Sequence, residues 1–281
     1  MESGERVAID VLEQSWLIWS RNKELHMRVS QTTIDTRELP WEPLSGAVSR
    51  KLLNGNPEVG PHTLLLRSLP REANGVSLGH YHPAAEEFFC LEGDFTFDEG
   101  VWFRDGAYAM YPAYCVHGTD VHVRGGYLLY LRLSGPGQLF MVGVPDATQA
   151  DDGSAEESRI DPSLQPSIME LAVSPAAKRA AAEHVADSAV MITALHRDAN
   201  GAGSTLVTAA ADSGLIEIES DRELELFAPS GTFAISGHAE LKTHGYHCEV
   251  DDRPRILVQC RESGSLLIGH GGELRVQQQG S

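Results

Sequence analysis

Two histidines one residue apart, His80 and His82, constrain the fold of this chain more than any other feature. Alternate side chains project from the same face of a β-strand, whereas a helix would separate two rings at this spacing. Glu86 follows after Pro83-Ala-Ala, which suits a turn, and Gly93 closes the stretch. If the chain reverses at this turn and pairs with itself, Glu86 returns to the two histidines. The stretch therefore predicts antiparallel β-structure that carries a site of two histidines and one carboxylate.

A second segment downstream has an apolar strand, a turn marked by proline and then a histidine, with Gly106, Pro112 and His117 at its key positions. Together the two segments resemble the paired motifs of the cupin superfamily. In that family the first motif is His-x-His, three or four residues, Glu, six residues and Gly, and the second places Gly, Pro and His at these three positions. The sequence departs from the second motif at Tyr114, where the family has Gly, and at Val121, where it has Asn. Both departures fall on turn positions, so we expect them to affect loop shape more than metal binding.

The resemblance implies one metal ion per chain, held by a set of four side chains. These are His80, His82, Glu86 and His117. Glu87 is an alternative carboxylate because the family tolerates a four-residue spacer, but the gap to Gly93 favours Glu86. A set of three histidines and one glutamate with open positions suits divalent Fe, Mn, Ni, Cu or Zn, and the sequence does not distinguish among these metals.

The charge of the chain argues against two classes of partner. The sequence has 22 Lys and Arg residues and 40 Asp and Glu residues, a formal net charge of -18. Electrostatic repulsion opposes binding to nucleic acid or to an anionic membrane, so neither is expected. No apolar run reaches the roughly 20 residues that span a bilayer, and the N-terminus has no cleavable leader pattern. We therefore expect a cytoplasmic protein, and its four scattered cysteines are expected to be reduced thiols.

The spacing of short apolar runs and Gly- or Asp-containing turns predicts an all-β fold of two tandem jelly-roll barrels (double-stranded β-helices) with a few short helices. Residues 1–40 are an N-terminal extension, read as a short helix or an edge strand, and residues 41–145 form the metal-binding barrel. Residues 146–185 are a polar, Ala-rich linker with one helix that begins near Pro175. Residues 186–281 form a second, degenerate barrel.

An internal repeat supports the second barrel. Residues 69–75, LPREANG, recur as LHRDANG at 195–201, an offset of 126 residues (195 minus 69). At this offset the four ligands are replaced by Leu206, Thr208, Asp212 or Ser213, and Lys242. The second barrel is therefore expected to bind no metal at the equivalent site. His244 and His247 have no carboxylate partner in this register, so they are interpreted as surface or structural residues.

Several residues are candidates for the wall of a substrate pocket around the metal. Phe88, Tyr108 and Tyr130 supply aromatic rings, with Trp102 as a further candidate, and ordinary barrel core is the alternative for each. Arg132 lies two residues after Tyr130 on the same strand face and could neutralise a substrate carboxylate. The alternative for Arg132 is a salt-bridged residue at the barrel rim.

The first barrel looks most like cupins of the ChrR anti-sigma-factor type and related small dioxygenases. This resemblance implies a dioxygenase-type oxidoreductase that acts on a small carbonyl or phenolic compound. Two alternatives remain open: a metal-dependent isomerase or lyase on a sugar acid, and a non-enzymatic metal-binding sensor. A sensor of the anti-sigma type would need a helical companion domain, and residues 1–40 show no pattern for one. The expected partners are a small-molecule substrate and, in a homodimer, a second copy of the chain.

Overall fold

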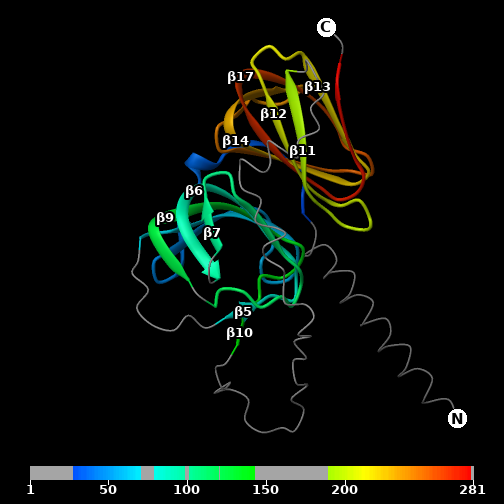
Figure 1. Cartoon of the computed structure of the whole chain (residues 1–281). Coiled ribbons are helices and arrows are strands. Elements are labelled where there is room, and N and C mark those ends of the chain that lie inside the picture. Colours follow the sequence, from blue (N-terminus) through cyan, green and yellow to red (C-terminus); the bar gives the residue numbers. More distant parts are fainter. Residues whose placement is uncertain (1–27, 71–78, 99–100, 120, 143–188, 280–281) are drawn as a thin grey trace, which may run out of the picture.

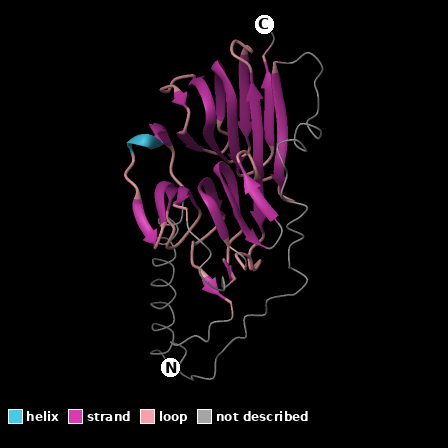
Figure 2. Ribbon diagram, turned by 60° about the vertical axis from the view of Figure 1, so that its left-hand side comes forward, coloured by secondary structure: helices cyan, strands magenta, loops and turns pink. Residues whose placement is uncertain are grey.

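The computed structural model describes residues 28–70, 79–98, 101–119, 121–142 and 189–279. Within these residues the chain consists of β-strands, turns and a single 3-10 turn, η1 (Thr36–Glu38). Figure 1 shows two barrels stacked on each other, and Figure 2 shows that strands make up both. The all-β prediction is confirmed, whereas the helix expected near Pro175 lies outside the described residues. No helix in the described part of the chain is long and apolar enough to cross a membrane.

The N-terminal barrel is an antiparallel sheet in the order β2-β3-β4-β9-β6-β7, with β8 also paired to β6. A separate two-stranded ribbon, β5-β10, lies at its lower end in Figure 1. The strands are β2 (Glu42–Ser45), β3 (Val48–Gly55), β4 (His62–Ser68), β5 (His80–Tyr81), β6 (Glu86–Asp98), β7 (Val101–Arg104), β8 (Tyr108–Tyr111), β9 (His122–Leu133) and β10 (Phe140–Met141).

The C-terminal barrel has the order β1-β16-β14-β17-β12-β11. In addition, β13 pairs with β17 and with β18, and β15 pairs with β14. Its strands are β1 (Gln31–Asp35), β11 (Val190–Arg197), β12 (Gly203–Ala209), β13 (Leu215–Ser220), β14 (Glu223–Ile235), β15 (Leu241–Lys242), β16 (Gly245–Val250), β17 (Arg255–His270) and β18 (Leu274–Gln278). β1 belongs to the predicted N-terminal extension, yet it pairs with β16. The described part of that extension is thus an edge strand, and it is added to the second barrel.

Strands β6 and β9 are apolar on both faces because each face is covered. Phe88 of β6 and Leu131 of β9 point into the core of the first barrel. Their neighbours Phe89 and Tyr130 point outward into a cluster that also contains Phe227 of the second barrel. Burial of a large apolar side chain contributes about 1.5–3 kcal/mol. The two barrels are therefore joined by a real hydrophobic core as well as by the chain between them.

Strand pairing corrects the offset of the internal repeat. Phe89 of β6 is paired with Tyr108 of β8, and Phe227 of β14 is paired with Tyr246 of β16. β6 and β14 hold the same place in their sheets, each beside the long strand β9 or β17. Phe89 and Phe227 are therefore equivalent, and the structural offset is 138 residues (227 minus 89), not 126.

The sequence repeat matched two segments that are not equivalent. Residues 69–75 begin directly after β4, whereas residues 195–201 lead from β11 into β12, the counterparts of β3 and β4. The two segments look alike because Asp, Asn and Gly suit turns in general. The prediction of a second barrel was right, but its alignment was displaced by about one strand.

Candidate metal centre

Four side chains converge at one mouth of the N-terminal barrel. His80 is on β5, His82 lies just past the end of β5, Glu86 begins β6, and His117 lies in the connection from β8 to β9. The backbones of His80 and His117 bridge each other through two N–H···O bonds of 2.8 and 2.9 Å. One ligand atom from each of the four residues lies within 4.8 Å of the others. The structure thus brings together the whole predicted set.

The spacing of these atoms fits metal coordination. Glu86 Oε2 lies 3.0 Å from His82 Nε2 and 3.5 Å from His117 Nε2. Two N or O ligands bound at about 2.0–2.2 Å, with angles between 90° and 109°, lie roughly 3.0–3.5 Å apart. A divalent transition metal therefore fits among the atoms where they stand.

Backbone carbonyls fix the orientation of two imidazoles. His82 Nδ1 lies 2.9 Å from the carbonyl oxygen of Gln138, and His117 Nδ1 lies 3.1 Å from that of Cys115. Since a carbonyl oxygen only accepts, the proton sits on Nδ1 when the ring is neutral, and the lone pair on Nε2 is directed into the site. His117 Nε2 is buried and makes no hydrogen bond. Its ion-pair partner Glu86 Oε2 is 3.5 Å away, and a metal ion between the two atoms would satisfy both.

Charge at the site matches a divalent cation. Burial and, to a smaller extent, the neighbouring His117 lower the pKa of His80 to about 4, so His80 is neutral at physiological pH. Burial alone would raise the pKa of Glu86, but His117 and His82 outweigh it and hold that pKa below the usual range. The pKa of His82 is raised because Glu86 outweighs the effect of burial. Glu86 is thus an anion, and it favours the charged form of His82.

Two turn positions near the ligands have a left-handed backbone conformation. Gly118 has φ +74°, and a Cβ atom there would lie 2.9 Å from the ring of His80. Tyr114, which stands where the family motif has Gly, has φ +64°. A left-handed conformation is uncommon for a residue with a side chain. The turn therefore keeps the glycine-like backbone although the glycine is absent, and the Tyr114 N–H donates to the His82 carbonyl at 2.7 Å.

The interior wall next to the site is aromatic. Tyr111 stacks on His117, with ring centroids 4.1 Å apart and planes 13° apart. Phe88 lies deeper, edge-on to Phe103 at 5.0 Å. Phe88 is therefore on the site's side of β6, as predicted. Tyr111 was missed, although alternation could have found it: it lies directly opposite Glu86 in the β6–β8 pairing.

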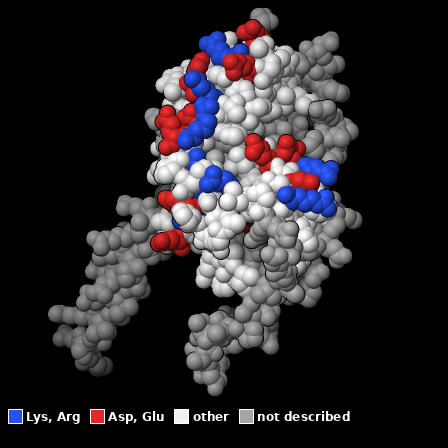
Figure 3. Space-filling view, turned by 90° about the vertical axis from the view of Figure 1, so that its left-hand side faces the viewer, with Lys and Arg blue, Asp and Glu red and all other residues white. Residues whose placement is uncertain are grey.

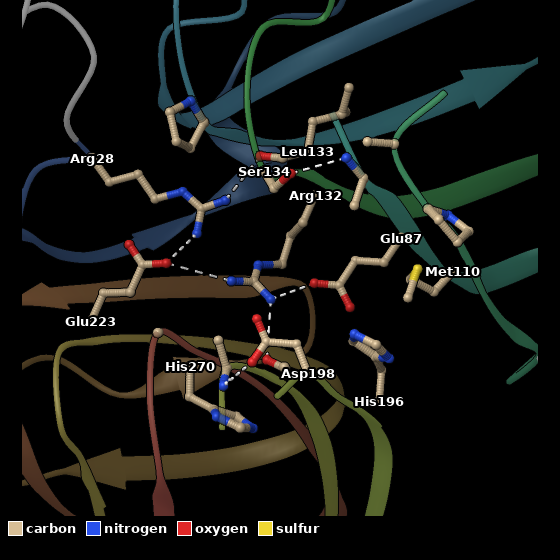
Figure 4. Close-up of a pocket in the computed structure, with 17 residues that line it drawn as sticks. Arg28, Glu87, Met110, Arg132, Leu133, Ser134, His196, Asp198, Glu223 and His270 are labelled. Atoms are coloured by element: carbon tan, nitrogen blue, oxygen red, sulfur yellow. Dashed lines mark hydrogen bonds and ion pairs between the residues drawn. The ribbon is translucent and has the colours of Figure 1, made fainter. Parts of the chain in front are cut away.

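The other predicted pocket residues, Tyr108, Tyr130 and Arg132, lie on the wrong face. Register places them opposite Phe89 and Glu87, so they point away from the metal site and toward the second barrel. Figure 4 shows Arg132 in a cavity between the barrels, reaching Glu87. Trp102 also points outward, where the Arg124 guanidinium stacks 3.7 Å from its ring centroid. The salt-bridge alternative thus describes Arg132, and Glu87 is a partner of Arg132 and not a member of the ligand cluster.

Comparison with known proteins identifies the fold. Residues 29–134 match a family model described as a ChrR cupin-like domain. These residues include the four converging side chains. The N-terminal barrel therefore matches the ChrR-like cupins over residues 29–134. No curated protein in the comparison matches the chain.

Solved structures match both barrels. A putative dioxygenase from Nostoc punctiforme is 15% identical with a TM-score of 0.57, covering 89% of this chain and 83% of its own. Oxalate decarboxylase from Bacillus subtilis, in a structure at pH 4.6, is 14% identical with a TM-score of 0.52, covering 90% and 77%. The 7S globulin of Momordica charantia is 11% identical with a TM-score of 0.51, covering 88% and 86%. At such identities the likeness shows the cupin fold alone.

The C-terminal barrel lacks the cupin ligand set. Leu224 is the second residue of β14 and Glu86 the first of β6, and each is paired with the last residue of the long strand beside it. Ile218 is paired with Ile256 as His80 is bridged to His117. The four ligand positions hold Ile218, Ser220, Leu224 and Ile256, all of them buried. The residues expected from the 126-residue offset were wrong; Leu206, for example, packs in the cluster between the barrels.

A charged network shows the same equivalence across the interface. The Tyr108 hydroxyl donates to Glu87 at 2.5 Å, and the Tyr246 hydroxyl donates to its equivalent, Glu225, at 2.7 Å. Arg132 binds both carboxylates, with nitrogen–oxygen distances of 2.5 and 3.2 Å. Arg28, from just before β1, also pairs with Glu225. The interface thus buries carboxylates from both cupin barrels around shared arginines.

Proposed function

We propose that this protein is a metal-dependent cupin oxidoreductase of the dioxygenase type, which acts on a small neutral carbonyl or phenolic compound. One observation supports it above the others. A converging set of three histidines and one glutamate stands at the mouth of a barrel whose interior is apolar and aromatic. The proposed ligands are His80, His82, Glu86 and His117.

A divalent metal held by the four side chains would supply Lewis-acid activation of the substrate and, as Fe(II), reactivity toward O₂. The chain's own contribution is orientation. Gln138 and Cys115 hold Nδ1 protons through their carbonyls, so both rings keep Nε2 available. Glu86 supplies the single negative charge, and Tyr111 restrains the ring of His117 by stacking.

The charge of the surroundings favours a neutral substrate over a sugar acid. A dianionic or carboxylate substrate needs a cation in the pocket. The buried Lys and Arg side chains of the described residues all make their contacts elsewhere. Lys51 donates to the Thr36 carbonyl at 2.8 Å, and Arg28 and Arg132 bind carboxylates between the barrels. An aromatic interior suits a phenolic ring and limits the entry of water.

Oxygen uptake tests the proposal. Protein purified without a metal-affinity column is loaded with Fe(II), and O₂ consumption is recorded with a panel of small diketones and dihydroxylated aromatics. We expect uptake only with substrate, loss of uptake in His117→Ala, and retention in His196→Ala, which changes a histidine in the cavity between the barrels.

Two outcomes would replace this function. Turnover that continues unchanged without O₂ would favour the isomerase or lyase. A tightly held metal with no turnover across the panel would favour the sensor.

A further inference from the structure

A second cluster of metal-ligating side chains lies in the C-terminal barrel. His238 is in the turn between β14 and β15, and His247 and Glu249 are both on β16. One ligand atom from each lies within 4.8 Å of the others. Glu249 Oε1 is 3.0 Å from His247 Nε2 and 3.3 Å from His238 Nε2. Ligands of a tetrahedral Zn²⁺ at about 2.1 Å lie roughly 3.4 Å apart, so the three atoms stand close to three corners of such a site.

His247 is held in place for this role. Its side chain is fully buried, and Nδ1 lies 3.4 Å from the Thr33 hydroxyl of β1. A ligating histidine almost always has its other ring nitrogen engaged by an oxygen in this way. The same arrangement occurs at His82 and His117, where carbonyl oxygens take the part of the Thr33 hydroxyl. Nε2 of His247 is thereby directed at the other two members of the cluster.

The cluster is open on one side. The side chains of His238 and Glu249 are 29% and 26% exposed, so an ion and a water molecule can reach them. Three protein ligands and an open fourth position are the pattern of accessible zinc sites.

This cluster is separate from the cupin ligand positions of the same barrel. Those positions hold Ile218, Ser220, Leu224 and Ile256. Glu249 lies on the neighbouring strand and is paired with Leu224, just as Tyr111 is paired with Glu86 in the first barrel. Glu249 is therefore the equivalent of Tyr111. His247 corresponds to Ala109 in that register, so the first barrel has no counterpart of the cluster.

We propose that His238, His247 and Glu249 bind a divalent cation of the Zn²⁺ class, with water in the fourth position. The ion would tie the β14–β15 turn to β16, and through Thr33 it would favour the docking of β1. The inference is independent of the proposed function, because it uses none of the residues of the first site.

Metal stoichiometry of the full chain tests the proposal. Metal-free protein is titrated with Zn²⁺ by calorimetry, and bound metal is counted by elemental analysis after gel filtration. We expect about two ions per chain in the wild type and about one in His238→Ala or Glu249→Gln. Both changes are in partly exposed side chains, so the barrel core is left intact. Glu240→Gln, two residues from His238, is the matched control and should keep both ions.

A second pair of variants separates the two sites. His80→Ala with His82→Ala should leave about one ion, and adding His238→Ala should leave none. Wild-type protein that binds about one ion, with the same number in Glu249→Gln, would overturn the second site and leave the proposed function standing. Two ions in His238→Ala and in Glu249→Gln would overturn it as well.

Discussion

Two glycines show how single residues shape both regions of interest. Gly118 leaves room for the ring of His80, and Gly269 leaves room for Arg132 between the barrels. Gly269 is paired with Glu225 as Arg132 is paired with Glu87, so the second barrel has glycine where the first has arginine. One guanidinium can therefore serve carboxylates from both barrels.

Gly118→Ala should weaken metal binding. The new Cβ would lie 2.9 Å from the His80 ring, and the ring must move from its position in the ligand set. Displacement of the support around a ligand typically costs 10- to 100-fold in metal affinity, so we expect a loss of about that size by calorimetry. Gly46→Ala is the control, because Gly46 also has positive φ (+52°) but nothing lies within 4 Å of its Cβ position. Equal losses of affinity in the two variants would contradict the steric explanation.

Gly269→Ala should destabilise the interface. The added methyl would lie 2.5 Å from Arg132 Cζ, and overpacking of a buried site costs about 1–3 kcal/mol. Guanidinium unfolding measures the effect. Gly125→Ala, in β9 with open space around the Cβ position, should change the free energy of unfolding by less than about 0.5 kcal/mol. An unchanged midpoint for Gly269→Ala would mean that Arg132 does not need this space.

At the scale of the element, two adjacent glutamates of strand β6 have different roles. Glu86 faces the barrel interior with the histidines, and Glu87 faces the second barrel with Arg132. Alternation along a strand predicts that the two carboxylates lie on opposite faces. It does not predict which face is covered by another domain, because apolar residues line both.

The substitutions Glu86→Gln and Glu87→Gln should therefore affect different properties, metal binding in the first case and stability in the second. Glu86→Gln should abolish metal binding at the His80 cluster but not at the His238 cluster, and it should have the smaller effect on the stability of metal-free protein. Glu87→Gln should keep the metal and lower the free energy of unfolding by about 3 kcal/mol, because it leaves the buried Arg132 short of a charged partner. Metal analysis and guanidinium unfolding of both variants check this. Loss of metal in Glu87→Gln would make Glu87 the ligand after all.

The same distinction explains what the sequence could predict. The convergence of His80, His82, Glu86 and His117 was predictable because these residues fall in two short motifs, and because the His-x-His spacing favours a strand. The pocket wall was not, since Tyr108 and Tyr130 are as aromatic as true interior residues and only register shows that they face outward. The second barrel was predictable from its strand pattern. Its alignment was not, because turn sequences such as 69–75 and 195–201 recur at positions that are not equivalent.

At the scale of the whole molecule, the barrels are joined by charge as well as by apolar contact, while the outer surface carries mixed charge. On the face in Figure 3, Lys and Arg side chains lie next to Asp and Glu side chains along one edge. The charges that connect the barrels are buried instead. Thr63 of the first barrel donates to Glu225 of the second at 2.6 Å, and Arg132 donates to Ser204 at 3.2 Å. In both hydrogen bonds the donor belongs to the first barrel and the acceptor to the second.

This network should make the union of the barrels sensitive to acid. Burial alone would raise the pKa of Glu225, but Arg28 and Arg132 outweigh it and lower the pKa to about 2, from about 4.5 in the unfolded chain. Between these values the unfolded chain binds more protons than the folded one, so the stabilisation is fully present above about pH 4.5 and is lost as the pH falls toward 2. The pKa of Glu87 is lowered as well, because Arg132 outweighs the effect of its burial. Each carboxylate contributes a slope of up to about 1.4 kcal/mol per pH unit.

The measurement is guanidinium unfolding of metal-free protein at several pH values between 5 and 2, followed by circular dichroism. Metal-free protein is used so that protonation of the histidine site does not contribute through lost metal. We expect the free energy of unfolding to fall with acid, and Glu225→Gln to be less stable at pH 7 with a shallower dependence on pH. Glu219 forms a partly exposed ion pair with Arg275. Glu219→Gln is therefore the control and should keep the wild-type slope. If Glu225→Gln kept the full slope, carboxylates outside the interface would be responsible for the acid sensitivity, and the two barrels would be held together mainly by their apolar contacts.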